Sequence, residues 1–144
     1  MNEIKVRTGY YAHAAKYQKN GYLTVSISLI TPRWAVPYVD HRIAALAPSQ
    51  SILDTLPDTE TYTKRYREEV LSRLDPKKIY EEEIAHFAKI RGKKKVVLLC
   101  YESAEKFCHR HIVADWLNDA HPWGDAAERV EEIALSELAP TATA

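Results

Sequence analysis

The sequence predicts an α/β fold in three layers, with a mostly parallel sheet of about four strands and helices on both faces. Apolar segments of strand length alternate along the chain with segments of helical period, which is typical of right-handed crossover connections. Residues 96–99 (VVLL) are apolar without alternation, as expected for a central parallel strand buried on both faces. Polar and aromatic residues follow the predicted strands directly, where an open α/β sheet binds its ligands.

The first part of the chain contains two predicted strands. Residues 3–7 alternate in polarity and form the first strand. Residues 10–19 are rich in alanine and tyrosine and form a short helix or ordered loop. The second strand, residues 23–30 (LTVSISLI), alternates apolar side chains with threonine and serine, and Pro32 prevents its continuation.

The middle of the chain is predicted to be a long connection that ends in two helices. Residues 35–57 contain three prolines and no sustained period, so we expect irregular chain with helical turns near 42–46 and 49–54. From residue 58 to residue 74, apolar side chains recur at helical spacing. Asp75 and Pro76 end this helix and begin the next, as N-cap and first helical residue.

The central strand, a polar turn and a further helix make up residues 93–117. We expect the helix to begin near residues 107–108. At about 100° per residue, His109 then lies in the centre of the apolar stripe and faces the sheet, with its two sequence neighbours at the edges of the stripe. His111 is expected to face solvent.

The chain is predicted to form one domain. Its 144 residues suffice for a single hydrophobic core. Residues 129–135 are a plausible last strand, so the domain is expected to span residues 1–135, with a mobile C-terminal tail from 136 to 144.

Composition excludes several function classes. Lysine plus arginine number 20, as do aspartate plus glutamate, so no global field attracts duplex DNA or an anionic membrane. The apolar runs are too short for a membrane span and the amino terminus lacks a secretory signal, so we expect a cytoplasmic protein. In that reducing compartment the two cysteines are expected to be free thiols rather than a disulfide.

The strand end LLCYE, followed after a short turn by FCHRHIVADWL, resembles the domain of unknown function 488 family. Members of that family carry a similar strand, Cys and Glu, and then Cys, His and Arg at the start of a helix. The segments IKVRTGYYA, SISLITPRW, LAPS and YTKRYREEVLSRLDP extend the similarity over most of residues 3–117. The resemblance implies a compact α/β domain of bacteria and their phages, and no established activity. The matching motif residues are Cys100, Glu102, Cys108, His109 and Arg110.

Two enzymatic interpretations use this motif. Cys108, near a helix amino terminus and two cationic side chains, would have an acidic thiol and could act as a nucleophile, with Glu102 or His109 moving protons. However, the chain lacks the compact Cys and Arg loop of phosphatases and rhodaneses. Glu102 could instead be a general acid or base in hydrolysis or glycosidic-bond transfer on a nucleotide whose phosphate lies at the helix terminus.

A phosphorylated small molecule or nucleotide is therefore the expected ligand, and the identity of any cofactor is unknown from the sequence. A non-catalytic module that binds a nucleotide or a nucleic-acid end is the alternative. Basic and aromatic residues near the strand ends would bind the phosphate and stack on the base. The expected ligand-binding residues are Arg110, Cys100, Tyr101, Arg33, Trp34, Tyr10 and Tyr11.

Zinc binding is a further alternative. Cys100, Cys108, His109 and His111 supply suitable ligand types, but the chain has no Cys-x-x-Cys pair and the helical wheel directs His111 away from the others. No metal ligand is therefore assigned.

Each motif residue also has a purely structural interpretation. Cys100 would be a small buried hydrophobe, and His109 a core histidine bonded to a backbone carbonyl. Arg110 would pair with Glu102 or Asp115 and fix the turn.

Overall fold

The computed structural model describes residues 4–102, 106–120 and 129–139. Its sheet has five parallel strands in the order β3-β2-β4-β1-β5. The strands are β1 (Lys5–Tyr10), β2 (Tyr22–Ser26), β3 (His41–Arg42), β4 (Lys95–Cys100) and β5 (Glu131–Glu132). The predicted α/β class is confirmed, and the apolar segment 96–99 lies in β4 at the centre of the sheet.

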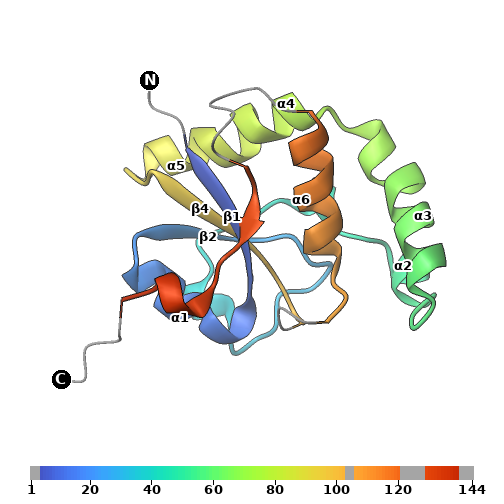
Figure 1. Ribbon diagram of the computed structural model, residues 1–144, viewed down its shortest axis with the longest axis horizontal. Coiled ribbons are helices and arrows are strands. Elements are labelled where there is room, and N and C mark those ends of the chain that lie inside the picture. The colour runs from blue at the N-terminus through green and yellow to red at the C-terminus, as the bar shows by residue number, and fades with distance from the viewer. Residues whose placement is uncertain (1–3, 103–105, 121–128, 140–144) are drawn as a thin grey trace.

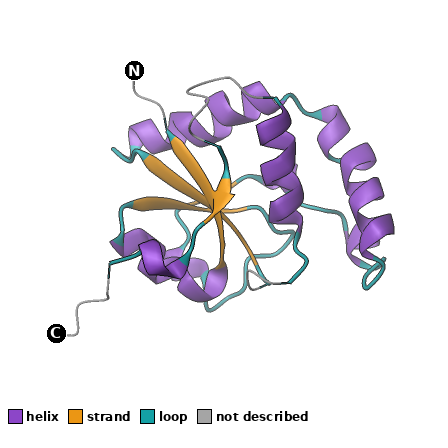
Figure 2. Ribbon diagram, viewed as in Figure 1, coloured by secondary structure: helices purple, strands orange, loops and turns teal. Residues whose placement is uncertain are grey.

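Helices cover both faces of this sheet (Figures 1 and 2). They are α1 (Ala14–Lys19), α2 (Gln50–Leu53), α3 (Thr59–Glu69), α4 (Pro76–Lys78), α5 (His86–Ile90) and α6 (His109–Asp119). A π-helical segment, Ile79–Ala85, joins α4 to α5. Short 3₁₀ turns span Tyr11–His13, Val36–Tyr38, Ala44–Leu46, Leu71–Arg73 and Leu135–Glu137.

Alternate side chains of β4 belong to two separate cores. Val96 and Leu98 pack with residues of α3, α5 and α6 on one face of the sheet. Val97 and Leu99 pack with α1 and with Ile133 on the other face. Because successive side chains of a strand point to opposite faces, an unbroken apolar run serves both cores. This is the predicted three-layer arrangement.

The sheet contains one strand that was not predicted, β3, which lies in the segment expected to be irregular; its Arg42 falls where a helical turn was expected. Backbone pairing of β3 with Val25 and Ser26 of β2 forms this strand. Asp40, just before it, accepts a hydrogen bond from the backbone N–H of Thr24 (3.0 Å) and donates its own backbone N–H to the Thr24 carbonyl (2.9 Å). These contacts come from β2, so no local pattern in β3 itself signals a strand.

Two predicted strands are shorter than expected. The second ends at Ser26 instead of residue 30, because the Ser26 hydroxyl bonds the Tyr11 hydroxyl (2.6 Å) and the Thr31 hydroxyl (2.9 Å) where the chain turns away. The last strand comprises Glu131–Glu132 alone. Beyond it, Glu137 binds Arg7 at 2.6 Å, and residues 140–144 of the expected tail lie outside the described part of the chain. None of the described helices is both long and apolar enough to cross a membrane.

Candidate functional site

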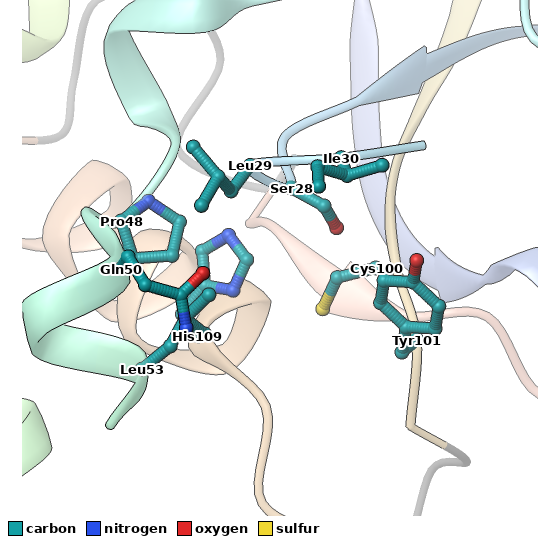
Figure 3. A pocket seen from close by; sticks show the side chains of 9 residues that line it. All are labelled: Ser28, Leu29, Ile30, Pro48, Gln50, Leu53, Cys100, Tyr101 and His109. Atoms are coloured by element: carbon teal, nitrogen blue, oxygen red, sulfur yellow. The ribbon is translucent and has the colours of Figure 1, made fainter. Parts of the chain in front are cut away.

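A cavity of about 180 Å³ lies beyond the carboxyl ends of β2 and β4, beside the start of α6 (Figure 3). Leu29, Ile30, Pro48 and Leu53 give it apolar walls. Its remaining lining comes from Ser28, Gln50, Cys100, Tyr101 and His109. The sequence-predicted residues Cys100, Tyr101 and His109 therefore meet at one cavity, at the edge of the sheet where parallel strands expose their ligand sites.

His109 faces the sheet, as the helical wheel predicts. It is 4% exposed, and its Nε2 lies 2.7 Å from the carbonyl oxygen of Ile27. Burial, with a further contribution from Arg110, lowers its pKa to about 4 although the bond to Ile27 opposes the shift. The ring is therefore neutral at neutral pH. Because a carbonyl can only accept, Nε2 carries the proton and Nδ1 the lone pair.

Cys100 and Cys108 form a disulfide, so the prediction of free thiols is wrong. Cys100 ends β4 and Cys108 is the N-cap residue of α6, so the disulfide joins these two elements, and Cys100 lines the cavity. The prediction was based on the expected reducing compartment, whereas the fold determines which sulfurs meet. In this oxidised state Cys108 offers no thiolate for nucleophilic attack.

Arg110 is completely buried and is held by Glu132. Its Nε and Nη2 donate to the two Glu132 carboxylate oxygens, each at 3.0 Å, and Nη1 lies 3.3 Å from Cys100 Sγ. The Thr8 hydroxyl donates to the same carboxylate at 2.6 Å. Burial alone would raise the pKa of Glu132, but the hydrogen bonds from Arg110 and Thr8 outweigh burial and lower it. The structural partner of Arg110 is therefore Glu132, in place of the predicted Glu102 or Asp115.

Sequence reasoning missed Glu132 because it follows Arg110 by 22 positions and is brought near by β5. The one feature of the sequence that could have indicated Glu132 is the presence of a carboxylate inside the predicted last strand. His111 is corrected as well, because it is half-buried and its Nε2 has no hydrogen-bond partner among the described residues. A side chain directed fully to solvent was expected there.

The other predicted site residues do not line this cavity. Tyr11 is buried and its hydroxyl donates to Ser28 (3.0 Å), while Tyr10 lies under the Arg110 guanidinium at 5.5 Å. Glu102 is exposed just after β4. Arg33 and Trp34 are exposed in the turn after β2.

A second cavity of about 370 Å³ adjoins the first and was not anticipated. The two cavities share Leu29 and Pro48 in their linings, so they are neighbours. Arg42 and Arg73 contribute positive charge to the second cavity. Arg42 is fixed by hydrogen bonds from Nη2 to the carbonyl oxygens of Ser28 (3.2 Å) and Leu29 (2.8 Å), which orient the guanidinium at the end of β2.

The comparisons with known proteins place the chain in a family. A family model described as the active DUF488-N3 subclade matches residues 13–121, which is more than half of the chain. This match covers the strand end at Cys100 and the start of α6, where the site residues lie. No curated protein and no solved structure matches the chain. The protein therefore belongs to the DUF488 family, in agreement with the resemblance carried by its Cys, Glu and Cys, His, Arg motif.

Proposed function

We propose that this domain is an enzyme acting on a nucleotide or a related phosphorylated ligand at the carboxyl edge of the sheet. The observation that carries the proposal is the adjacency of the two cavities, one apolar and one basic. A nucleotide has a comparable division into a planar base, whose faces pack on apolar side chains, and an anionic phosphate. In the proposed pose the base occupies the apolar cavity against Tyr101, which is 50% exposed, and the phosphate lies near Arg42 and Arg73.

Arg42 and Arg73 replace Arg110 as the proposed phosphate ligands. The Arg110 guanidinium is committed to Glu132, whereas Nη1 of Arg42 makes no hydrogen bond within the described part of the chain and Arg73 is exposed. Glu69 also lines the basic cavity, but its carboxylate is held by Arg65 at 2.6 Å, which reduces its repulsion of an anion.

Glu102 is the proposed general acid or base. It follows the cavity-lining residue Tyr101 directly, and its side chain is exposed. Hydrolysis or transfer at a glycosidic bond would use such a group. The description of the family as an active subclade supports turnover over binding alone.

Thermal denaturation of the purified protein with nucleotides, dinucleotides and sugar phosphates tests the proposal. A ligand at a hundred times its Kd stabilises the native state by about 2.7 kcal/mol, which raises Tm by several degrees. Arg73→Ala should reduce the shift given by the active ligand class. Lys89→Ala, which removes an exposed positive charge on α5, should leave it unchanged. Absence of a shift with every phosphorylated compound would contradict the proposal, as would equal shifts in both variants.

A non-catalytic binding module is the second candidate. Two of the predicted catalytic groups already have structural partners, which favours binding without catalysis. Cys108 is in a disulfide, and His109 donates to a backbone carbonyl. Glu102→Gln separates the two functions. In an enzyme this variant keeps the thermal shift and loses turnover, whereas a binder shows the same shift and no turnover in either form. Short single-stranded oligonucleotides in the same screen test a nucleic-acid end as the ligand.

A further inference from the structure

Three side chains of metal-ligating type gather beside the apolar cavity, and two of them, Cys100 and His109, line it. Cys100, Cys108 and His109 are all buried, and one ligand atom from each lies within 4.8 Å of the others. Figure 3 shows the Cys100 sulfur directed toward the side of the cavity that His109 lines. Two sulfurs and an imidazole form a donor set that favours zinc over hard cations such as magnesium. We propose that reduction of the Cys100–Cys108 disulfide creates a zinc site formed by these three residues.

The spacing of the cluster fits this metal. Thiolates that each lie about 2.3 Å from zinc are about 3.8 Å apart in a tetrahedral site. The two sulfurs and one ring nitrogen of His109 lie within 4.8 Å of one another, so they are already close enough to share one ion once the disulfide opens. No backbone segment needs to be brought in from elsewhere, because the end of β4 and the start of α6 already hold the three ligands together.

The tautomer of His109 leaves one ring nitrogen available to a metal. Its Nε2 donates to the carbonyl oxygen of Ile27 at 2.7 Å, so the lone pair of the neutral ring is on Nδ1. Histidines that bind zinc generally donate their other ring N–H to a carbonyl or carboxylate, which fixes the tautomer and the ring plane. The Ile27 carbonyl therefore has the geometry of such a supporting contact.

The surrounding charges also balance. Two thiolates neutralise a zinc ion, and Arg110 Nη1, 3.3 Å from Cys100 Sγ, can donate to a thiolate there. The positive charge of Arg110 is in turn compensated by Glu132 through two contacts of 3.0 Å. No buried charge in this group would be left without a partner, which is the condition for holding charges in a protein interior.

Three protein ligands leave the fourth position of a tetrahedral zinc ion free. Cys100 and His109 both line the cavity of about 180 Å³, so a water molecule or a ligand group in that cavity can fill it. Catalytic zinc sites share this open position, whereas structural sites use four protein ligands. The inference does not depend on the proposed nucleotide function, because it follows from the ligand cluster alone.

The chemistry of forming the site is balanced. A trialkylphosphine and one water molecule convert the disulfide into two thiols and yield the phosphine oxide. Zinc then replaces the two thiol protons, which are released to solvent, and two sulfur–zinc bonds form. Both steps use the full-length protein without any other cofactor.

The test is a zinc titration of the reduced protein without oxygen, after removal of the phosphine. Zinc bound per chain is measured by elemental analysis, and cobalt(II) is substituted to detect thiolate-to-metal charge-transfer absorption. We expect one equivalent in the reduced protein and none in the oxidised protein, which has the same sequence but lacks thiolates. Cys108→Ser should weaken binding at least about tenfold, whereas His86→Ala, an exposed histidine on α5, should bind as the wild type does.

Two results would overturn the inference. One is equal metal binding by the reduced and oxidised proteins, and the other is undiminished binding by a folded Cys108→Ser variant. If that variant does not fold, the cobalt spectrum of the reduced wild type decides, since a spectrum without thiolate absorption excludes Cys100 and Cys108 as ligands. No nucleotide is present in this experiment, so its failure leaves the proposed function intact, and a failed nucleotide screen leaves the zinc site intact.

Discussion

Replacement of Glu132 by glutamine should destabilise the protein strongly, because Arg110 would lose its counter-charge inside the protein. The Arg110 side chain is 0% exposed and that of Glu132 is 20% exposed. Removing one partner of a buried ion pair costs about 3–5 kcal/mol. Glutamine keeps one oxygen that can accept from Arg110, so we expect a loss near the lower end, about 3 kcal/mol. In a domain of this size that corresponds to a decrease in Tm of roughly 10 °C.

Urea unfolding followed by circular dichroism measures this loss, and Glu137→Gln is its matched control. Glu137 also pairs with an arginine, Arg7, but its side chain is 42% exposed. Arg7 additionally donates to the backbone carbonyls of Glu131 (3.1 Å) and Glu132 (3.2 Å), so it keeps partners when Glu137 is changed. The control should lose about 1 kcal/mol or less. Equal losses in the two variants would refute the argument that burial makes the Arg110 pair indispensable.

Two further predictions concern His109 and Gly9. Burial lowers the pKa of His109 from 6.5 to about 4. As the pH falls between these two values, the unfolded chain binds a proton on His109 before the native protein does. The free energy of unfolding therefore decreases over this pH range, by up to about 3 kcal/mol. Urea unfolding at several pH values should show a weaker decline in His109→Gln, and an unchanged decline would contradict the assignment. A Cβ at Gly9 would lie 2.6 Å from the buried Tyr17 ring, so Gly9→Ala should cost about 1–3 kcal/mol in thermal denaturation. Gly92→Ala, with nothing within 4 Å but a φ of +68°, should cost less, and the opposite order would exclude the steric explanation.

The sequence predicts those features that depend on local patterns. The unbroken apolar run 96–99 identifies the central strand, because each of its side chains needs a core on its own face of the sheet. Helical periodicity places His109 against the sheet, and the carbonyl of Ile27 confirms that direction. Asp75 caps the helix that Pro76 begins, with its side chain accepting from the backbone N–H of Lys77 at 3.0 Å.

Features that depend on distant pairing were not predictable from local patterns. The strand β3 has two residues, which is too short to show a period of two, and its existence depends on backbone bonds to Val25 and Ser26. The structural interpretation paired Arg110 with Glu102 or Asp115, which are close to it in sequence. Pairing of β5 with β1 instead brings Glu132 to it across 22 positions. The structural interpretation correctly paired Arg110 with a carboxylate, but the order of the strands in the sheet determines which carboxylate this is.

The same pairing changes which arginine can recognise a ligand. Arg110 could bind an anion fully only by giving up the carboxylate of Glu132, and that exchange would leave Glu132 without its cation beside Thr8. Loss of ligand binding in Arg110→Ala would therefore be difficult to separate from damage to the fold. Arg73 is exposed, lines the basic cavity and forms no buried ion pair with any described residue. The Arg73→Ala variant therefore tests phosphate binding while the pair of Arg110 with Glu132 stays intact.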